Sequence, residues 1–271
     1  MNGRVLIISG SDSGGGAGAQ ADLKSVMAMD AFATTAITAL TAQNTEGVHG
    51  VVGIDPAFIA QQIEVVLSDI GTDALKTGML HSAAVIEAVA ASLAKHAPGT
   101  PLVVDPVMVA KGGYRLLLNE AETALRNVLL PMATLLTPNL PEAEVLVGFP
   151  VRTEADMPRA AAALAALGAK AVLMKGGHLE GDRVVDLLFH GGKVDRFEDA
   201  RIPTRNTHGT GCTLASAIAA GLAQRMTLHD AVARARLYVR RAIETAPAYG
   251  RGHGPLNHAV TVDVGRLGGV W

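Results

Sequence analysis

Residues 206–213, NTHGTGCT, combine a glycine-rich turn with the only cysteine of the chain. Gly209, Gly211 and the first turn of the helix that follows would present unpaired backbone N–H groups at the positive end of a helix dipole. The hydroxyls of Thr210 and Thr213 could cap that helix or contact a bound anion. The spacing therefore predicts an anion pocket, although an ordinary helix start with a buried structural cysteine fits it equally well.

Charged and amide side chains follow three apolar runs of the sequence. Lys175 ends KAVLMK, Asp105 follows LVV, and Asn139 and Glu142 follow LLTP. A lysine provides a point charge for a phosphate, and a carboxylate at a buried strand end needs a partner. Asp105 and Glu142 are therefore predicted to hold Mg²⁺, directly or through water. Two simpler interpretations stay open, in which Lys175 only reaches solvent and Glu142 only stabilises a helix N-terminus.

A second glycine-rich stretch, GGGAGA at residues 14–19, formally satisfies the relaxed dinucleotide-binding fingerprint. Its placement argues against that function, because GSDS separates it from the preceding apolar run and the candidate acid, Asp30, precedes the second strand. No lysine with serine or threonine follows the last glycine, so a Walker loop is excluded too. We interpret the stretch as a mobile glycine loop that covers a substrate, with a plain turn as the alternative.

The elements that must position these side chains alternate along the chain. Mostly apolar runs, typical of central strands of a parallel sheet, are predicted at residues 4–9, 73–78, 101–106, 133–138 and 170–177. Helical patterns are predicted at residues 20–29, 56–68, 82–96, 120–130, 154–167, 210–223 and 228–245. This alternation predicts an α/β fold: a three-layer, doubly wound, mostly parallel sheet flanked by helices on both faces.

Two segments depart from the alternation. Residues 34–45 alternate threonine with alanine or leucine, which indicates a strand with two unlike faces. Residues 182–202 are predicted to form a hairpin about Gly191 and Gly192, so antiparallel edge strands should complete the sheet. No linker or repeat interrupts the pattern, and residues 1–271 are expected to form a single domain. Because ligands of such sheets bind beyond the carboxyl ends of the strands, the polar side chains described above should meet at one edge.

The composition excludes several classes of protein. Aromatic residues make up 3% of the chain and the formal net charge is -2, which argues against a nucleic-acid partner. A single cysteine cannot form an internal disulfide, so a reducing, cytoplasmic location is expected. No apolar run approaches the roughly 18 residues of a membrane span. The nine histidines show no metal-ligand spacing and are interpreted as surface or turn residues.

Seven segments, in order along the chain, together resemble the bacterial hydroxymethylpyrimidine/phosphomethylpyrimidine kinases of thiamine biosynthesis, which belong to the ribokinase-like superfamily. They are SGSDSGGGAGAQADLK, ITALTAQNTEGV, KTGML, VVDPVMVAKGG, TPNLPEAEVL, VLMKGGH and NTHGTGCTLASAIAA. The resemblance extends to about Pro255, and the tail that follows does not fit it. It implies a ribokinase-like kinase that uses ATP and Mg²⁺ to phosphorylate 4-amino-5-hydroxymethyl-2-methylpyrimidine to its monophosphate and then to the diphosphate.

The resemblance also implies a substrate pocket. Gln43 would hydrogen-bond the aminopyrimidine edge, since a glutamine amide presents a donor and an acceptor together. Asp22, Met79 and Val107 would line the pocket, with the Gly10 region above it. The substrate is a small molecule, and because the family often dimerises, a homodimer is expected.

The remaining implied roles concern ATP, magnesium and catalysis. ATP phosphates and Mg²⁺ would be handled by Asp105, Asn139, Glu142 and Lys175, and Lys111 matches a flap lysine that reaches the phosphates on closing. The anion hole and the catalytic base would lie at Gly209, Thr210, Gly211 and Cys212.

Cys212 occupies the position at which the wider superfamily commonly has an aspartate that takes the proton of the substrate hydroxyl. A free thiol has a pKa near 8.5, and a helix N-terminus can lower it toward neutrality, which suits a general base. The sequence analysis therefore expects Cys212 to be such a base.

Three other functions stay open at this point. Pyridoxal or pyridoxine kinase is the nearest, because relatives on this fold phosphorylate a hydroxymethyl group on a similar ring. A non-catalytic pyrimidine-binding sensor would retain the fold and lose catalysis, against which the presence of Asp105, Glu142, Lys175 and Cys212 argues. A dinucleotide-dependent oxidoreductase is the third.

Overall fold

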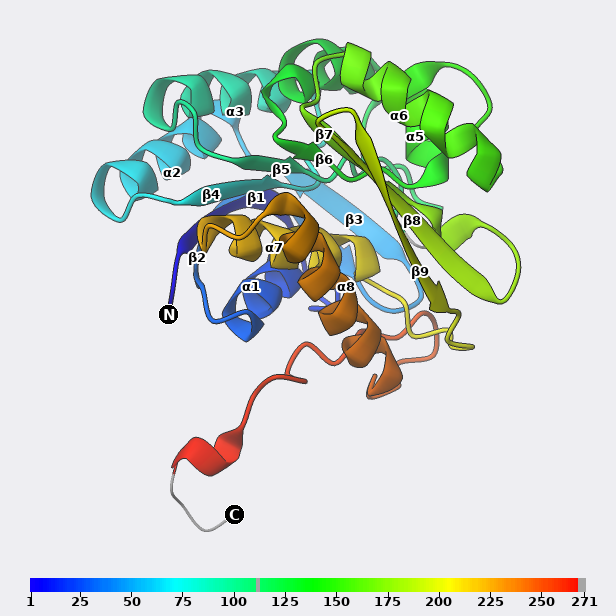
Figure 1. Ribbon diagram of the computed structural model, residues 1–271. Helices are drawn as coiled ribbons and strands as arrows, with labels where there is room; N and C mark the ends of the chain where they lie inside the picture. The colour runs from blue at the N-terminus through cyan, green and yellow to red at the C-terminus, as the bar shows by residue number, and fades with distance from the viewer. Residues whose placement is uncertain (111–112, 268–271) are drawn as a thin grey trace.

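The strands form one nine-stranded sheet between two layers of helices in the computed structural model, which describes residues 1–110 and 113–267 (Figure 1). The strand order is β3-β2-β1-β4-β5-β6-β7-β8-β9. The bounds are β1 Arg4–Asp12, β2 Phe32–Gln43, β3 Val48–Gly53, β4 Ala74–Thr77, β5 Leu102–Val104, β6 Leu135–Leu136, β7 Ala171–Lys175, β8 Arg183–His190 and β9 Lys193–Ala200.

The centre of the sheet is parallel and both of its edges are antiparallel. Strands β2, β1, β4, β5, β6 and β7 pair in parallel, while β8 pairs antiparallel with β7 and β9. The predicted hairpin at Gly191 and Gly192 and the predicted fold class are thus confirmed. The other edge differs from the prediction, because β3 adds an antiparallel strand beside β2 that the sequence analysis missed. Its sequence, VHGVVG, contains two glycines and lacks a regular apolar alternation.

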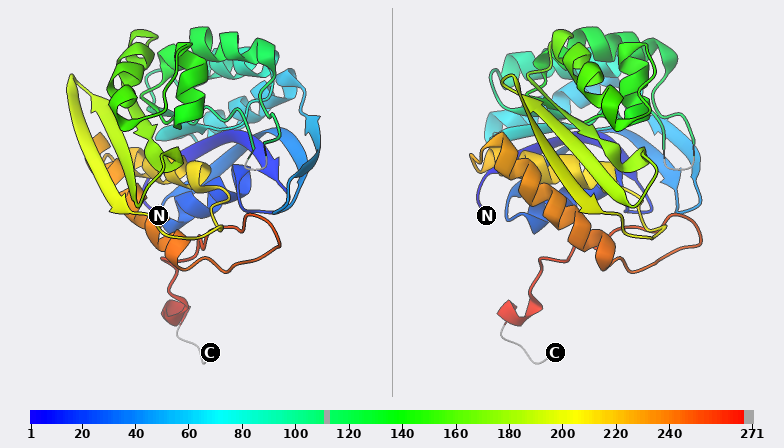
Figure 2. Two further views of the ribbon diagram at one scale, coloured as in Figure 1. Left: turned by 90° about the vertical axis from the view of Figure 1, so that its right-hand side faces the viewer. Right: turned by 45° about the vertical axis from the view of Figure 1, so that its right-hand side comes forward.

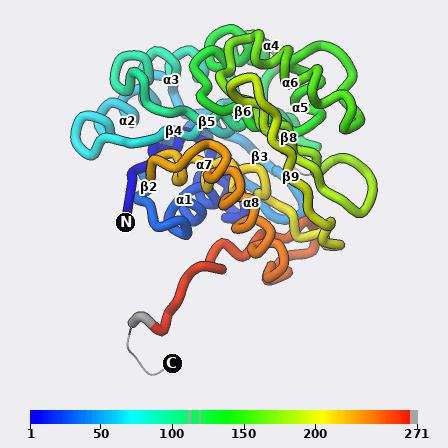
Figure 3. Tube along the Cα trace, in the orientation of Figure 1, coloured from blue at the N-terminus to red at the C-terminus, as the bar shows by residue number. Residues whose placement is uncertain are grey.

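Two helical layers cover the sheet (Figures 1 and 3). One layer contains α2 Pro56–Asp69, α3 Ala83–His96, α4 Asn119–Ala124, α5 Leu140–Val147 and α6 Met157–Ala166. The other contains α1 Gly18–Ala28, α7 Thr210–Ala223 and α8 Leu228–Glu244. Alternate residues of β1 serve the two cores: Leu6 and Ile8 face one, and Val5 and Ile7 face the other. Burial of each such side chain stabilises the fold by about 1.5–3 kcal/mol.

Helix bounds differ from the predictions in one half of the molecule. The helix predicted over residues 120–130 is shorter, because α4 passes into a π-helical turn, Leu125–Leu129, and a 3₁₀ turn, Leu130–Met132. Helix α5 was anticipated only through the alternative that Glu142 lies at a helix N-terminus, and its bounds were not predicted, because NLPEAE reads as a polar loop. Its proline, Pro141, sits in the first helical turn, where a missing N–H costs nothing.

The chain beyond α8 returns along the lower side of the molecule before it leads away (Figure 2). His208 pairs with Pro255 in a parallel bridge, and the Tyr238 hydroxyl donates to the carbonyl of His258. These contacts hold the segment against the glycine turn that precedes α7. In the described ranges, no helix combines the length and the apolar character needed to cross a bilayer.

Candidate active site

A cavity of about 650 Å³ opens at the carboxyl ends of the central strands. Its wall includes residues that end or follow β1, β2, β4, β5, β6 and β7, so the loops predicted to meet at one edge of the sheet do so. The strand order reverses direction between β1 and β4, and the carboxyl ends of the strands beside such a switch point are the usual ligand position in these sheets.

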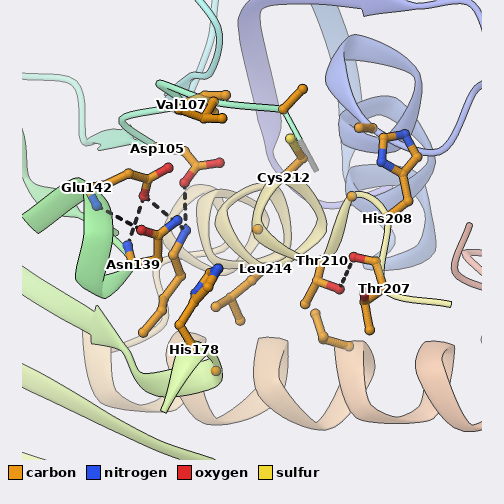
Figure 4. Close-up of a pocket in the computed structure, with 18 of the residues that line it drawn as sticks. Asp105, Val107, Asn139, Glu142, His178, Thr207, His208, Thr210, Cys212 and Leu214 are labelled. Atoms are coloured by element: carbon orange, nitrogen blue, oxygen red, sulfur yellow. Dashed lines mark hydrogen bonds and ion pairs between the residues drawn. The ribbon is translucent and has the colours of Figure 1, made fainter. Parts of the chain in front are cut away.

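One ammonium lies between two carboxylates at one end of the cavity (Figure 4). Lys175 Nζ is 2.9 Å from Asp105 Oδ1 and 4.0 Å from Glu142 Oε2. The three residues come from the ends of β7 and β5 and the first turn of α5, and they lie 33 to 70 positions apart in the sequence. Asp105 is 2% exposed. The structure therefore brings together the three charges that the sequence placed at separate strand ends.

Burial and neighbouring charges set the protonation of this cluster. Burial alone would lower the pKa of Lys175, but Asp105 and Glu142 outweigh it and raise the pKa above its ordinary value. Burial also raises the pKa of the Glu142 carboxyl, and the Asp105 charge adds to the rise, while Lys175 and Asn139 oppose it. Two carboxyl groups thus share one ammonium, and Glu142 is the one whose ionisation is disfavoured.

Asn139 and Glu142 form a capping box at the start of α5. The Glu142 N–H donates to Asn139 Oδ1 at 2.9 Å, and the Asn139 N–H donates to Glu142 Oε2 at 2.8 Å. The simpler interpretation of Glu142 as an acid at a helix N-terminus is therefore correct as far as it goes. Glu142 Oε2, which accepts from Asn139, is also the oxygen that lies 4.0 Å from Lys175 Nζ, and Oε1 has no protein partner in the described ranges.

The glycine turn before α7 reaches the same cluster. Gly209 is the N-cap residue in the left-handed conformation, with φ of 82°. A Cβ there would collide with the carbonyl of Gly16, so the turn requires glycine. A Cβ at Gly211 would lie 3.2 Å from Lys175 Nζ, which places the first turn of α7 beside the ammonium. Within the described residues, no protein acceptor takes the N–H groups of Gly211 and Cys212.

The threonine hydroxyls of the turn point in different directions. Thr210 Oγ1 donates to the carbonyl of Thr207 at 2.8 Å, which closes the turn and leaves its lone pairs available (Figure 4). Thr213 Oγ1 is buried and lies 2.9 Å from His258 Nε2. Thr213 therefore faces the core, away from any anion in the turn.

The protonation expected of Cys212 is wrong. The side chain lines the cavity, and burial raises the pKa of its thiol to about 12. Lys76 and an N–H of Gly18 lower it, as a helix N-terminus would, but Asp22 and Asp105 work in the opposite direction. Sequence spacing revealed the helix dipole and could not reveal the desolvation or the two carboxylates.

The loop at residues 14–19 is tied down by Asp12, an acid that the sequence analysis did not single out. The Asp12 carboxylate accepts the N–H groups of Gly14, Gly16 and Ala17 at 2.8–3.1 Å. It also accepts from His208 Nε2 at 2.9 Å. Burial raises the pKa of Asp12, but these bonds together outweigh burial and lower it. Because a protein carboxylate occupies the loop amides, a dinucleotide phosphate has no place there, and the loop is fixed in this state.

His208 is therefore a pocket residue that the sequence analysis missed. It lies in the turn before α7, as expected of most histidines, but it is 8% exposed and therefore not a surface residue, and His258 is buried as well. The available signal was its position inside the anion turn, three residues before Gly211.

Most of the implied substrate residues line the same cavity. Gly10, Gln43, Met79 and Val107 all line it. Asp22 does not: it is fully buried, accepts from Lys76 Nζ at 2.8 Å and Ser216 Oγ at 2.6 Å, and lies behind the wall. The prediction that Asp22 lines the pocket is thus corrected. Lys111 lies outside the described residues.

The neighbours of Gln43 fix the direction of its amide. The two amide heteroatoms lie 3.2 Å from Thr41 Oγ1 and 3.4 Å from His208 Nε2. The Thr41 hydroxyl proton goes to the carbonyl of Ser11 at 2.9 Å, so toward Gln43 this hydroxyl can only accept. His208 Nε2 donates to the ionised Asp12, so it cannot accept either. The amide nitrogen therefore faces Thr41 and the amide oxygen faces His208, an assignment made from partners rather than from atom positions.

Comparison with known proteins gives one consistent result. A sequence profile of the phosphomethylpyrimidine kinase family matches residues 12–257. The thiamine biosynthesis bifunctional protein ThiED of Geobacter sulfurreducens is 52% identical over 261 residues, 96% of this chain and 53% of that protein, so the chain spans about half of that relative. The hydroxymethylpyrimidine/phosphomethylpyrimidine kinase of Bacillus subtilis is 45% identical over 94% of each chain. The ADP complex of Bacillus subtilis pyridoxal kinase aligns with a TM-score of 0.88 at 36% identity, over 96% of this chain and 98% of that one.

Proposed function

The chain belongs to the phosphomethylpyrimidine kinase family, and we propose that it transfers the γ-phosphoryl group of ATP to 4-amino-5-hydroxymethyl-2-methylpyrimidine and then to the resulting monophosphate. The observation that carries this proposal is the meeting of the glycine-turn amides with Lys175, Asp105 and Glu142 at one end of a cavity. The amide of Gln43 and the apolar side chains of Met79 and Val107 line the same cavity.

The transfer depends mainly on positioning and charge. The free N–H groups of Gly211 and Cys212 would bind the oxygens of the transferring phosphoryl group, and Lys175 would neutralise part of its charge. Asn139 holds the first turn of α5 in place, and Thr210 closes the turn that carries the amides. Amides fixed by a helix start need no reorganisation when charge develops.

The carboxylates also fit Mg²⁺. Asp105 Oδ1 contacts Lys175 and Thr137, and Glu142 Oε2 accepts from Asn139, so each carboxylate keeps one oxygen without a partner in the described ranges. Hard divalent cations prefer such oxygens. No group of three or more potential ligands occurs among the described residues, so water and ATP phosphates would complete the coordination. Bound there, Mg²⁺ would neutralise phosphate charge.

The two transfers differ in their need for a base. In the first, the substrate hydroxyl attacks the γ-phosphorus, the bond to the β-phosphate oxygen breaks, and ADP leaves. The hydroxyl proton passes to the thiolate of Cys212 and from there to solvent. In the second, the attacking phosphate is already largely ionised at neutral pH, because its second pKa is near 6. Cys212 thus acts chiefly in the first transfer.

Gln43 supplies recognition of the ring. Thr41 and His208 fix the orientation of its amide. The amide oxygen and the second N–H therefore present an acceptor and a donor in a defined order to the pocket. An amine beside a ring nitrogen is the matching edge. Met79 and Val107 provide apolar contact for the ring faces.

Mass analysis of the products formed from ATP, Mg²⁺ and hydroxymethylpyrimidine tests the proposal. We expect a species with one added phosphoryl group, followed by one with two. A ligand that binds without any release of ADP would instead identify a sensor.

Pyridoxine is the second candidate substrate, because the aligned Bacillus subtilis structure is a pyridoxal kinase. Turnover of the pyrimidine and of pyridoxine, measured side by side, separates the two. We expect the pyrimidine to be preferred, since a pyridine ring lacks the amine that the Gln43 oxygen would accept from.

We also propose that the chain is a single kinase domain that works as a homodimer in the cytoplasm. One continuous sheet with cores on both faces supports the first point. Leu40 and Val52, which face each other across the β2–β3 edge and are 48% and 65% exposed, offer an apolar surface for a second copy. Sedimentation equilibrium on the chain and on the Leu40→Glu variant tests the dimer.

A further inference from the structure

A fully buried ion pair beneath the cavity has no part in the transfer described above. Lys76, on β4, is 0% exposed and donates to Asp22, on α1, at 2.8 Å. Ser216, on α7, donates to the other oxygen of the same carboxylate at 2.6 Å. Taking two charges out of water is costly, and a core of this size has ample apolar surface without them. The pair therefore calls for a functional reason.

The ion pair lies under Cys212. Ser216 follows Cys212 by four residues on α7, so the two side chains share one face of the helix. That helix packs on β4, the strand that carries Lys76. The N–H of Gly18, at the start of α1, bonds to Cys212 from the same side as Asp22. The three elements that hold the ion pair are thus the three that surround the thiol.

Lys76 also has hydrogen-bonding capacity to spare. An ammonium carries three N–H donors, and Asp22 is its single acceptor within the described residues. A thiolate at Cys212 would offer this ammonium a further acceptor.

The charges around Cys212 act in opposite directions. Lys76 from β4 lowers the pKa of the thiol, whereas Asp22 from α1 and Asp105 beyond β5 raise it. Lys175, at the end of β7, is a further cation among the described residues, and a negative charge at Cys212 would raise its pKa. Lys76 is therefore the principal charge that favours the thiolate over the thiol.

We propose that Lys76, held and kept charged by Asp22, is a positioning residue that stabilises the thiolate form of Cys212. Its catalytic meaning rests on the proposed role of Cys212 in the first transfer. The ionisation itself can be measured without substrate, so the two can fail separately.

Alkylation by iodoacetamide measures the thiolate directly, because Cys212 is the only cysteine in the chain. The rate should be recorded from pH 7 to 10 on the wild-type chain, on Lys76→Met, and on Lys76→Met combined with Asp22→Asn. Lys95→Met, which removes an exposed lysine from α3, is the matched control. Each unit by which the thiol pKa rises should slow alkylation about three-fold, since the smaller thiolate fraction is partly offset by higher nucleophilicity.

We expect Lys76→Met to react about ten-fold more slowly at each pH and Lys95→Met to match the wild-type chain. The double variant should fall between, because it also removes the Asp22 charge that opposes the thiolate. If the single variant does not fold, the double variant carries the test, since it buries no uncompensated carboxylate. Alkylation of folded variants at or above the wild-type rate would overturn the proposal, because loss of packing alone exposes the sulfur and speeds the reaction.

A kinase assay on the same proteins separates this inference from the proposed function. Slower alkylation combined with unchanged phosphorylation of hydroxymethylpyrimidine would leave Lys76 as the residue that ionises Cys212 and would remove the base role. Slower alkylation with a first transfer that is slowed more than the second supports both.

Discussion

At the scale of single residues, the ionisation of the Cys212 thiol depends on opposing effects and not on its position at the helix start alone. The helix start and Lys76 favour the thiolate, but burial and two carboxylates favour the thiol. With a pKa of about 12, the free enzyme holds little thiolate at neutral pH. For Cys212 to act as a base, bound substrate and ATP must lower the pKa of its thiol, or the hydroxyl proton must move only after the bond to phosphorus has largely formed.

Replacement of Cys212 by serine should slow the first phosphorylation more than the second. A general base contributes typically about 10²–10⁴-fold, and we expect the lower end, about 10²-fold, for the alcohol because the thiol is poorly ionised. The phosphate needs little deprotonation, so its transfer should change less than about ten-fold. Single-turnover rates with each substrate supplied separately measure both. Equal losses in the two steps would contradict the assignment of Cys212 to the alcohol.

Glu142 should make metal binding depend on pH. Burial and Asp105 raise the pKa of its carboxyl, so the protonated form, which cannot hold a cation, becomes more populated as the pH falls toward and below neutrality. The Mg²⁺ concentration needed for half-maximal activity should therefore rise on acidification. Glu142→Gln should need more Mg²⁺ at every pH and lose that dependence. Titrations of Mg²⁺ between pH 5.5 and 8.5 provide the comparison, and a wild-type curve that does not move would remove Glu142 from the metal site.

At the scale of elements, the two glycine loops are locked against each other. The α7 start depends on Gly209, whose missing side chain lets the carbonyl of Gly16 approach. Asp12 and His208 complete the junction by joining the first loop to the second turn. The anion site is therefore a property of two elements that are nearly 200 residues apart in the chain.

Gly209→Ala should disrupt this junction. We expect a loss of stability beyond the roughly 1 kcal/mol of left-handed strain, with at least a ten-fold loss in activity, because the turn amides must move. Gly148→Ala is the matched control: Gly148 has φ of 75° at the end of α5, and a Cβ there meets nothing within 4 Å. Urea unfolding and kinase assays of both variants separate the effect of the Cβ collision with Gly16 from the effect of left-handed backbone strain, which both variants share. Equal behaviour of the two would show that the loops can separate without cost.

At the scale of the whole molecule, one sheet connects every part of the site. The order from β3 to β9 is unbroken, and both cores use alternate residues of the same strands. Gly10 and Gln43 come from β1 and β2, whereas Asp105, Asn139 and Lys175 lie at the ends of β5, β6 and β7. Distortion of the central strands would therefore affect both groups of residues.

Thermal unfolding should show one cooperative transition, as expected of a single domain. The calorimetric and van't Hoff enthalpies should agree, because neither core can persist once the shared sheet is lost. ADP at a concentration of 100 times its Kd should stabilise that transition by about 2.7 kcal/mol. Two separate transitions, of which only one responds to ADP, would divide the chain into independent units.

The sequence by itself determined the elements and the strand-end side chains. The strands and helices could be predicted because apolar periodicity and capping are local. Glycines hid β3, and a proline in the first turn left α5 as an alternative without bounds. Carboxyl-end residues such as Asp105 and Lys175 could be predicted to meet because parallel strands align their ends.

Only the tertiary structure decided what those side chains contact. Asp22 with Lys76, and Asp12 with His208, join residues 54 and 196 positions apart, and no local pattern relates them. The same holds for the thiol of Cys212, whose ionisation is set by burial and by charges from β4, α1 and β5. Local sequence shapes the backbone, whereas desolvation and Coulomb interactions depend on distances that exist only after the sheet and its two helical layers have assembled.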